Sequence, residues 1–410
     1  MALIVQKYGG SSVVDADKIK HVARRVAATR DKGNDVVVVV SAMGKTTDQL
    51  ISLANQITDR PDVRELDVLL STGETVSSTM LAIALISLGH EAISLSGAQA
   101  GIWTDTAYSR ARILNVDAHR IVKELGKGRI VIVAGFQGIT DEMDITTLGR
   151  GGSDTTAVAM AASLGAQMCE IYTDVEGVYT ADPRLVPDAR KLRDLGYEEM
   201  LELASYGAKV LHYRAVELGE LCNVPILVAS SFNENPGTLI HGGIAMEVRN
   251  KVRGIVHDFN VAKVTVLGVP DRPGIATTIF ESLAKENVSV DTIVQNASVE
   301  RVTDLTFTVT KSDLKKAMRV AEPAAKSIGA TGCIADAKLG KVSIVGTGMQ
   351  NTPGYAAKMF RALYEKEINI ELITTSEIRI TCIIDESRVE DALIALHKAF
   401  QLEKEEDVIQ

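Results

Sequence analysis

The stretch VVVVVSAMGKTTDQL, residues 36–50, runs five consecutive valines into a polar loop and then into a helical pattern. An unbroken β-branched run predicts a strand that is buried on both faces, as in a largely parallel sheet covered by helices on each side. Gly44-Lys45-Thr46 also resembles the end of a phosphate-binding P-loop, but that motif needs a glycine five positions earlier, where Val39 stands. Because a β-branched residue resists the positive φ angles of such a loop, we exclude the P-loop.

The composition limits the classes of function. A chain of 410 residues exceeds one compact core of typical size, which predicts two or more domains. The formal net charge is -9 and no Lys/Arg-rich run occurs, so we expect neither a nucleic acid nor an anionic membrane as partner. The N-terminal MALIVQKYGG lacks the basic region of a signal peptide, and the longest apolar stretch, MLAIALISLG, is about half a membrane span. We therefore expect a soluble, cytoplasmic protein, whose four scattered cysteines are reduced thiols without a zinc site.

Up to about Gly243 the chain alternates short apolar runs with helical patterns. Asp15 is a candidate N-cap of a helix that reaches Lys32, and a second helix is expected from Glu65 to Leu88. We expect residues 1–245 to form one three-layer α/β/α domain. The predicted strands are LIVQKY, DVVVVVSA, AISLSG, RIVIVAGF, MCEIYTD and PILVAS.

A second region follows the segment NENPGTLIHGGIAME, which is rich in Asn, Pro and Gly. The sequence VTVLGVPDRPGIATTIF at Val264 returns as VSIVGTGMQNTPGYAAKMF at Val342. Each copy has the order strand, Pro-Gly turn, amphipathic helix, strand, strand, helix, which predicts two α+β, ferredoxin-like domains. We place them at residues 263–338 and 339–410, after a linker at 246–262 that contributes a strand. A repeat without a ligand stays possible, but the polar glycine loop before each helix favours a small charged ligand.

Four stretches of the first half place polar residues at strand ends or helix starts, where open α/β sheets carry their sites. QKYGGSS presents Lys7 before two glycines, which suits a phosphate, although a Gly-Gly turn is often only structural. GRGGSDTTA opens a helix with Ser153 as the expected N-cap, yet capping explains neither Arg150 nor the double glycine. STGETVSS places Glu74 among small residues, with a solvated side chain as the alternative. YTDVEGVYTADPR leaves a strand with acidic, aromatic and basic residues that suit a nucleotide.

Taken together, these stretches resemble the aspartate kinases of bacterial lysine and threonine biosynthesis. The motifs KYGGSS, SAMGKTTD, STGE, GRGGSDTTA, YTDVEGVYTADPR and YGAKVLH occur in the family's order and spacing. The repeat resembles the family's paired ACT regulatory domains, so the resemblance covers nearly the whole chain and is closest to the monofunctional type. One departure is Tyr213 in LHYRAV, where many relatives have proline.

The resemblance implies ATP-dependent phosphorylation of the side-chain carboxylate of L-aspartate, the first step of lysine, threonine and methionine synthesis, under feedback by the end products. Such a carboxylate is already ionised at pH 7, so the site needs cations and backbone N–H groups rather than a base. Magnesium would be held mainly through the ATP phosphates, without a dedicated protein metal site. The catalytic residues implied are Lys7 on the phosphoryl oxygens, Asp154 orienting it, Glu74 on the substrate ammonium and Arg150 on its α-carboxylate. The substrate would contact Ser41, Thr47, Glu74, Arg150, Gly151, Gly152 and Ser153, and the nucleotide Lys7, Tyr8, Gly9, Gly10, Thr173, Asp174, Tyr179, Asp182, Arg184 and Lys209.

For the repeat, the resemblance implies a homo-oligomer in which ACT domains of two chains share a sheet and bind lysine, threonine or both. The helix N-termini would hold the effector carboxylate, and acceptors on nearby strands its ammonium. Met246 lies in frame at the start of this half, which would allow a separate regulatory subunit from an internal start. The expected effector-binding residues are Asp271, Gly274, Ile275, Ala276, Gln295, Tyr355, Ala356, Asn369, Ile370, Ser376 and Glu377.

Two other functions stay open. A kinase for another acid, such as N-acetylglutamate, would share the fold, but STGE and the tandem repeat argue against it. A catalytically inactive amino-acid sensor would work through its ACT pair alone, and the intact set of charged site residues in the first half argues against that.

Overall fold

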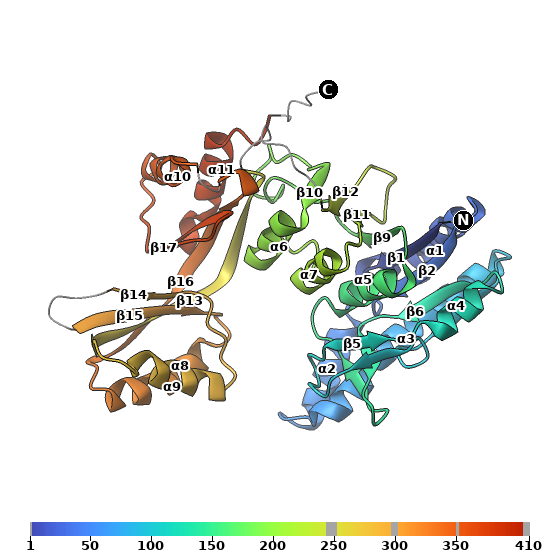
Figure 1. Cartoon of the computed structure of the whole chain (residues 1–410), viewed down its shortest axis with the longest axis horizontal. Helices are drawn as coiled ribbons and strands as arrows, with labels where there is room; N and C mark the ends of the chain where they lie inside the picture. Colours follow the sequence, from blue (N-terminus) through green and yellow to red (C-terminus); the bar gives the residue numbers. More distant parts are fainter. Residues whose placement is uncertain (1, 243–251, 297–301, 350–351, 405–410) are drawn as a thin grey trace. The chain divides into compact units, whose positions relative to one another are not determined.

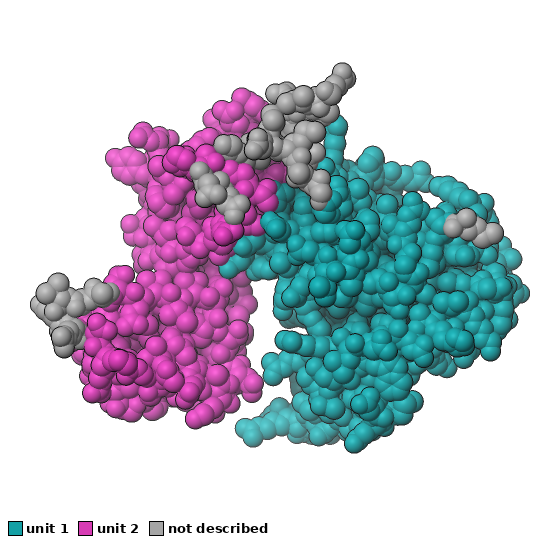
Figure 2. All heavy atoms as spheres, in the orientation of Figure 1, with its two compact units in different colours: residues 1–179, 191–247 teal, residues 180–190, 248–410 magenta. Residues whose placement is uncertain are grey.

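The computed structural model describes residues 2–242, 252–296, 302–349 and 352–404, which form two compact units (Figure 2). Unit 1 comprises residues 1–179 and 191–247, and unit 2 comprises residues 180–190 and 248–410. The segment 180–190 falls in the second unit, not with the rest of residues 1–245, because Ala181 and Val186 pack in the hydrophobic core of unit 2. Met246, the candidate internal start, lies outside the described residues.

Unit 1 is built on an eight-stranded sheet with the order β10-β12-β11-β9-β1-β2-β6-β3 (Figure 1). Only β11 and β12 pair antiparallel, and the other neighbours are parallel. All six strands predicted from apolar runs are present. The bounds are β1 (Leu3–Tyr8), β2 (Asp35–Val40), β3 (Ala92–Leu95), β6 (Ile130–Ala134), β9 (Met168–Thr173), β10 (Asp194–Gly196), β11 (Ile226–Ser230) and β12 (Thr238–His241).

Helices cover both faces of this sheet. Strand β2 is therefore buried on each side, as its valine run predicts. Val36, Val38 and Val40 pack in one cluster with residues of α1 (Ala16–Asp31) and α3 (Val63–Ser87). Val39 faces the other side, where a Cβ on Gly135 would lie 2.9 Å from Val39 and 3.0 Å from Ser153 of α5 (Gly152–Leu164). The predicted three-layer α/β/α architecture is therefore confirmed. The remaining helices of unit 1 are α2 (Thr46–Ile57), α4 (His119–Leu125), α6 (Tyr197–Tyr206) and α7 (Tyr213–Leu221), with a 3-10 turn η1 (Gly10–Val13).

Helix α3 is long and apolar enough to cross a membrane by length and composition, but half of its most apolar window is buried inside the protein. Its buried face carries two carboxylates, Asp67 and Glu74. It packs on α1 and on the sheet, as the core helix of a folded domain does.

A smaller sheet adjoins α3 and leads into α5. Its strand order is β5-β4-β7-β8, and β8 contacts α3. The bounds are β4 (Ile102–Thr104), β5 (Ile113–Val116), β7 (Gln137–Ile139) and β8 (Ile145–Thr147). The chain passes from β8 through Leu148 to Gly151 into the first turn of α5, so this sheet determines where that loop begins.

Unit 2 contains a six-stranded antiparallel sheet with the order β14-β15-β13-β16-β18-β17 and two helices from each repeat (Figure 1). The predicted order of elements occurs in both copies, and Gly274 and Gly354 precede their helices with φ of 92° and 106°. The bounds are β13 (Gly254–Pro270), α8 (Ile275–Lys285), β14 (Ile293–Gln295), β15 (Val302–Val309), α9 (Leu314–Ser327), β16 (Gly332–Val345), α10 (Tyr355–Tyr364), β17 (Leu372–Thr375), β18 (Arg379–Asp385) and α11 (Val389–Ala399).

The two copies share their central strands. Residues 254–258 of β13 pair with the end of β16 in the second copy, whereas residues 263–267 pair with the start of β16 in the first. Equivalent ion pairs cross between the copies: Lys263 Nζ lies 2.7 Å from Glu371, and Lys341 pairs with Asp291. The two copies of the repeat therefore form one continuous folded unit.

Candidate active site

The ends of four parallel strands meet at one edge of the large sheet. Tyr8, the last residue of β1, pairs with Val40 of β2 and with Tyr172 of β9, and Val40 pairs with Ala134 of β6. Carboxyl ends of parallel strands are where open α/β sheets bind ligands. The predicted polar stretches after β1, β2 and β9 are thus brought together by the fold.

A buried ion pair stands at this edge. Lys7 Nζ lies 2.6 Å from Asp154 Oδ1, and each residue is 8% exposed. Asp154 sits in the first turn of α5, where the helix dipole favours a negative charge. The carboxylate fixes one side of the lysine ammonium and leaves its other protons for an anionic ligand.

The glycine turn after β1 approaches the loop after β2 closely. A Cβ on Gly10 would lie 2.8 Å from the Ala42 carbonyl oxygen, so only glycine fits there. The Gly9 N–H donates to the Tyr172 carbonyl at 3.2 Å, which removes it from the expected set of phosphate donors. The side chain of Tyr8 is fully buried and stacks on Tyr172, so its backbone is the part that remains for a nucleotide.

Glu74 lies on the buried face of α3, contrary to the alternative of a solvated side chain. Its Oε1 accepts a hydrogen bond from the Ala42 N–H at 3.1 Å. Its Oε2 is buried and has no hydrogen-bond partner within residues 2–242 or the other described segments. Burial raises the pKa of Glu74 to about 7, against the opposing effect of backbone N–H groups. A buried carboxylate with an open acceptor suits a ligand cation.

The neighbouring substrate candidates lie on the same loop system. Ser41 follows β2 directly, its N–H donates to the Tyr8 carbonyl at 3.1 Å, and its own carbonyl accepts from Ser77 Oγ at 2.7 Å. Thr47 is in the first turn of α2. Ser77 lies one turn beyond Glu74, so α3 holds the end of β2 at two points.

Arg150 lies in the loop between β8 and α5, and its side chain is exposed. The helix begins differently from expectation: Gly151, with φ of 68°, is the N-cap, and Ser153 lies inside the first turn. The reason is the left-handed backbone at Gly151, which turns the chain one residue before Gly152 becomes helical. A Cβ at Gly151 would lie 2.1 Å from the His212 ring, so the loop packs directly on that side chain.

The nucleotide candidates are more dispersed. Thr173 ends β9 with its hydroxyl 3.1 Å from Asp174, which is exposed. Tyr179 bridges to Lys191 in unit 1, and Lys209 is exposed in the turn between α6 and α7.

Asp182 and Arg184 belong to unit 2 and form an ion pair with each other, with Nη2 2.6 Å from Oδ2. Arg184 lowers the pKa of Asp182.

The departure at Tyr213 has a simple structural reading. Tyr213 is the first residue of α7, and His212 caps that helix by accepting from the Arg214 N–H at 3.4 Å. Proline is favoured at the first helical position because its missing N–H has no partner there. Tyr213 therefore stands at a helix position where proline is also favoured.

The effector candidates all lie in unit 2. Asp271 and Gly274 through Ala276 surround the start of α8, and Tyr355 and Ala356 begin α10. Gln295 ends β14, while Asn369 and Ile370 precede β17 and Ser376 and Glu377 follow it. Strands β14 and β17 are the two edges of the sheet, so the two sets of candidates stand at opposite edges.

Several residues around the site were not predicted from the sequence. Asp67 lies two helical turns before Glu74 on the same face of α3, a spacing that could have been recognised. His212 and Arg214 contact the Arg150 loop only because α7 packs on α5, which no local pattern reveals.

Comparison with known proteins fits this geometry. The amino acid kinase family matches residues 2–230, and the ACT domain matches residues 264–324 and 342–400. The chain is 50% identical over 413 residues to an aspartokinase of Corynebacterium efficiens, covering 99% of this chain and 98% of the relative. It is 51% identical over 405 residues to an aspartokinase of Pseudomonas aeruginosa, with 98% of each chain covered.

Solved structures agree on the fold. E. coli aspartokinase III in complex with aspartate and ADP superposes with a TM-score of 0.81 at 24% identity, over 97% of this chain and 99% of that one. Aspartate kinase from Synechocystis is 46% identical with a TM-score of 0.55, over 98% of this chain and 70% of that one.

The fold and its strand-end site thus define an amino acid kinase, a phosphotransferase, followed by a pair of ACT domains. Within that class, the chain belongs to the aspartokinase family.

Proposed function

We propose that the protein transfers the γ-phosphoryl group of ATP to the side-chain carboxylate of L-aspartate, giving 4-phospho-L-aspartate and ADP. A carboxylate oxygen forms the new bond to phosphorus as the bond from phosphorus to the β-phosphate oxygen breaks, and no proton needs to be removed. The observation that carries this proposal is the buried Glu74, with an open oxygen, at the same strand-end edge as the Lys7–Asp154 pair. The open Glu74 oxygen suits an amino-acid ammonium, and the Lys7 ammonium suits the negative charge of a phosphoryl group.

Each residue then has a role that follows from its place. Lys7 neutralises charge on the transferring phosphoryl oxygens, and Asp154 holds its ammonium in place. Glu74 binds the substrate ammonium, and Arg150 binds the α-carboxylate through its planar guanidinium. Ser41 and Thr47 line the aspartate side, with the backbone of Gly151 to Ser153 at the N-terminus of α5 facing the anions.

The nucleotide side rests on the motif. We assign it to Thr173, Asp174, Tyr179 and Lys209, which all lie in unit 1.

Magnesium fits this residue set as an ion held by phosphates. Within the described ranges, no three His, Cys, Asp or Glu side chains gather into a metal site. Mg²⁺ usually keeps several waters and takes one or two carboxylates beside substrate phosphates, and Asp154 and Asp174 are two of the carboxylates at this edge. When bound, the ion neutralises phosphate charge.

The direct test is a coupled assay of ADP release with L-aspartate, N-acetyl-L-glutamate and L-glutamate as alternative acceptors. We expect turnover with L-aspartate at least a hundredfold above that with the other two, and trapping of the acyl phosphate by hydroxylamine. Turnover with N-acetylglutamate instead would identify another acid kinase of the same fold. If no ADP is released with any of the three acids, the catalytically inactive sensor is favoured.

We further propose that the reaction opens lysine, threonine and methionine synthesis and that the ACT pair senses lysine, threonine or both. The edge strands β14 and β17 each have one neighbour in the described sheet. They expose Ile293 and Ile373, at 53% and 44%, at equivalent positions of the two copies. An apolar, unpaired strand edge is a template for pairing with another chain, which supports a homo-oligomer built through the ACT domains.

A separate regulatory subunit starting near Met246 is a further proposal from the sequence. Expression of the native gene, followed by detection with an antibody against the C-terminus, should give the full-length chain and a second product of the size of residues 246–410. Mutation of Met246→Leu should remove the smaller product alone. A single full-length band from the unmodified gene would rule the second subunit out.

A further inference from the structure

The two proposed contacts to the amino-acid substrate come from different elements, Glu74 from α3 and Arg150 from the loop after β8. A substrate of fixed length needs the two held at a fixed separation. The Arg150 side chain is exposed, whereas Glu74 is buried. The position of Arg150 therefore depends on how the backbone of its loop is anchored. The structure contains such an anchor on α3 itself.

Asp67 is fully buried, and its carboxylate accepts three hydrogen bonds. Oδ2 accepts from the Thr147 N–H at 2.8 Å and from the Ser109 N–H at 2.9 Å, and Oδ1 accepts from the Thr147 hydroxyl at 2.7 Å. A buried carboxylate is costly unless its acceptors are used, and here several donors from one small region converge on it. Helix α3 therefore grips the end of β8, three residues before Arg150.

The loop beyond Thr147 is fixed by further contacts, and the neighbouring turn at residues 109–111 that bonds to it has strained backbone. Arg214 donates to the Leu148 carbonyl at 2.6 Å and to the Ala111 carbonyl at 2.9 Å, and the Ala111 N–H donates to the Thr147 carbonyl at 2.9 Å. Ser109 has a φ of 68°, which is unfavourable for a residue other than glycine and persists only where surroundings impose it. The Asp67 bond to the Ser109 N–H is one such constraint.

We propose that Asp67 is a positioning residue for aspartate binding, which holds the Arg150 loop at a set distance from Glu74 on the same helix. The inference rests on the proposed roles of Arg150 and Glu74. Asp67 and Glu74 lie seven residues apart, two turns along one face of α3, so a single rigid element carries both the ammonium acceptor and the anchor of the carboxylate-binding loop. Loss of this anchor weakens aspartate binding and leaves Lys7 and the nucleotide-binding residues unaffected.

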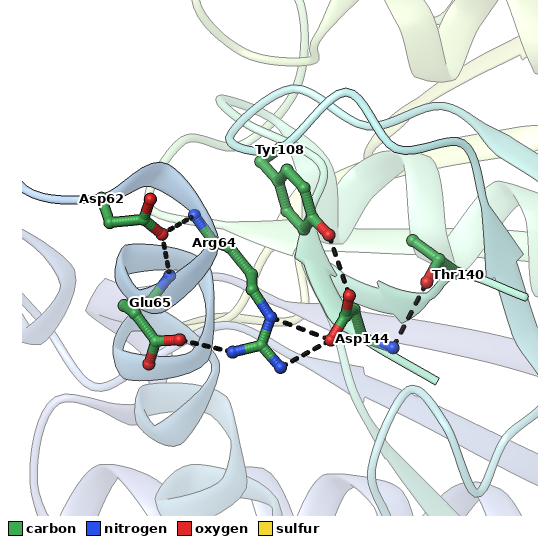
Figure 3. A network of polar contacts seen from close by, with 6 residues as sticks. All are labelled: Asp62, Arg64, Glu65, Tyr108, Thr140 and Asp144. Atoms are coloured by element: carbon green, nitrogen blue, oxygen red, sulfur yellow. Dashed lines mark hydrogen bonds and ion pairs between the residues drawn. The ribbon is translucent and has the colours of Figure 1, made fainter. Parts of the chain in front are cut away.

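A second link between α3 and the same sheet supplies a matched control. Figure 3 shows Asp144, which precedes β8, between Arg64 of α3 and the Tyr108 hydroxyl. Arg64 Nη2 lies 2.6 Å from Asp144 Oδ1, but the Arg64 side chain is 44% exposed. The Asp144 side chain is 20% exposed, so the pair is more accessible to water than the fully buried Asp67, and Asp144 is six residues from Arg150 rather than adjacent to its loop. Asp144→Asn therefore weakens attachment of the same sheet without removing any of the three hydrogen bonds to Asp67.

The test compares five full-length variants, Arg150→Lys among them, by steady-state kinetics for both substrates, with thermal unfolding of each as a fold check. Asp67→Asn keeps the shape but loses the charge: the two N–H groups at Oδ2 keep only a neutral acceptor, and the amide NH2 group meets the Thr147 hydroxyl in place of an acceptor. We expect its KM for L-aspartate to rise at least tenfold and its KM for ATP to stay within twofold. Thr147→Val removes only the hydroxyl, for a rise of about threefold to tenfold in the KM for aspartate, and Thr147→Ser restores it. Asp144→Asn should keep both KM values within twofold.

The inference fails if Asp67→Asn and Thr147→Val fold and leave the KM for aspartate within twofold of wild type, or if the KM for ATP rises equally. If Asp67→Asn does not fold, the contrast between Thr147→Val and Thr147→Ser decides alone. Arg150→Lys separates this inference from the proposed function. An aspartate defect in Arg150→Lys without one in the Asp67 and Thr147 variants removes only the positioning role. Absence of a defect in Arg150→Lys removes the substrate assignment itself.

Discussion

Lys7 Nζ lies 2.6 Å from Asp154 Oδ1, with 11% and 12% of the two side chains exposed. An ion pair so little exposed is a fixed positive group rather than a mobile surface lysine. Its counter-charge comes from a helix N-terminus, so the pair is held by two elements, β1 and α5.

Replacement of this lysine tests its role in the phosphoryl transfer. Lys7→Ala should lower kcat by roughly a hundredfold or more, because charge that develops in transit loses its fixed partner. Kinetics should be paired with an unfolding curve, since Asp154 is left buried without a partner. Lys20→Ala is the control: Lys20 lies on α1 with a side chain 63% exposed, and turnover should stay at the wild-type level. A folded Lys7→Ala enzyme with near-normal kcat would remove Lys7 from the mechanism.

Glu74 should make both stability and aspartate binding depend on pH. Its pKa of about 7 in the folded protein exceeds the ordinary value of 4.5, so the folded state favours the protonated acid. The resulting stability is fully present below pH 4.5 and is lost as pH rises through 7, by about 3 kcal/mol. Glu74→Gln mimics the neutral acid, so the ligand-free variant should unfold at higher denaturant concentration than wild type at pH 8 and equally at low pH.

The same carboxylate must be ionised to bind an ammonium. In the wild-type enzyme, kcat/KM for aspartate should fall as pH drops below about 7, because the free enzyme then carries neutral Glu74. Glu74→Gln should show a much higher KM for aspartate and lose this limb of the profile. A Gln variant that is less stable than wild type at pH 8, with an unchanged profile, would show that Glu74 is held ionised by another group.

Arg150→Lys keeps the charge and loses the planar fork that grips a carboxylate at two points. The KM for aspartate should rise about tenfold or more, while the KM for ATP changes little. Arg120→Lys, on the surface helix α4, serves as the control with both KM values unchanged. Equal rises for the two substrates in Arg150→Lys would place the residue elsewhere in the site.

Bulky substitutions at the sheet edges test effector sensing. Gln295→Trp beside β14 or Ser376→Trp beside β17 should relieve inhibition by lysine or threonine and spare turnover without effector. A coupling of about 1–3 kcal/mol corresponds to a 5- to 150-fold change in apparent substrate affinity, and aspartate must then weaken effector binding by the same factor. Glu281→Trp, on the exposed side of α8, should keep inhibition. If neither amino acid, alone or combined, slows the wild-type enzyme at low aspartate, the repeat is structural.

Much of the fold was predictable because the deciding signals are local. The valine run of β2 marks a strand buried on both faces, and Asp15 does cap α1 by accepting from the Lys18 N–H. The offset repeat after Val264 gave the order of elements in unit 2. Each of these features depends on neighbours in sequence or on a copy of itself.

What the sequence missed depends on contacts made at a distance. Serine is favoured at N-caps, but the left-handed Gly151 starts the helix earlier, so Ser153 lies inside the first turn. Tyr8 stands in a binding motif, yet the alternation along β1 turns its ring into the core against Tyr172. Asp67 gains its meaning only when β8 folds against α3. Residue type and spacing therefore predicted the polar stretches after β1, β2 and β9 that the strand ends bring together, and tertiary packing decided which of their atoms are accessible.

The segment Thr180–Arg190 has a consequence for how this chain can be divided. The backbone leaves unit 1 after Tyr179, contributes Ala181 and Val186 to a core that includes Ile344 and Leu393, and re-enters unit 1 at Lys191. Thr180 is tied there through its hydroxyl to His397 at 2.9 Å and through its carbonyl to the Ile255 N–H at 2.7 Å. The boundary is thus crossed three times, and no single cut separates complete modules. A chimera that exchanges regulatory halves between relatives needs a graft of residues 180–190 as well, and a fragment begun near residue 246 must find another apolar surface to fill that place.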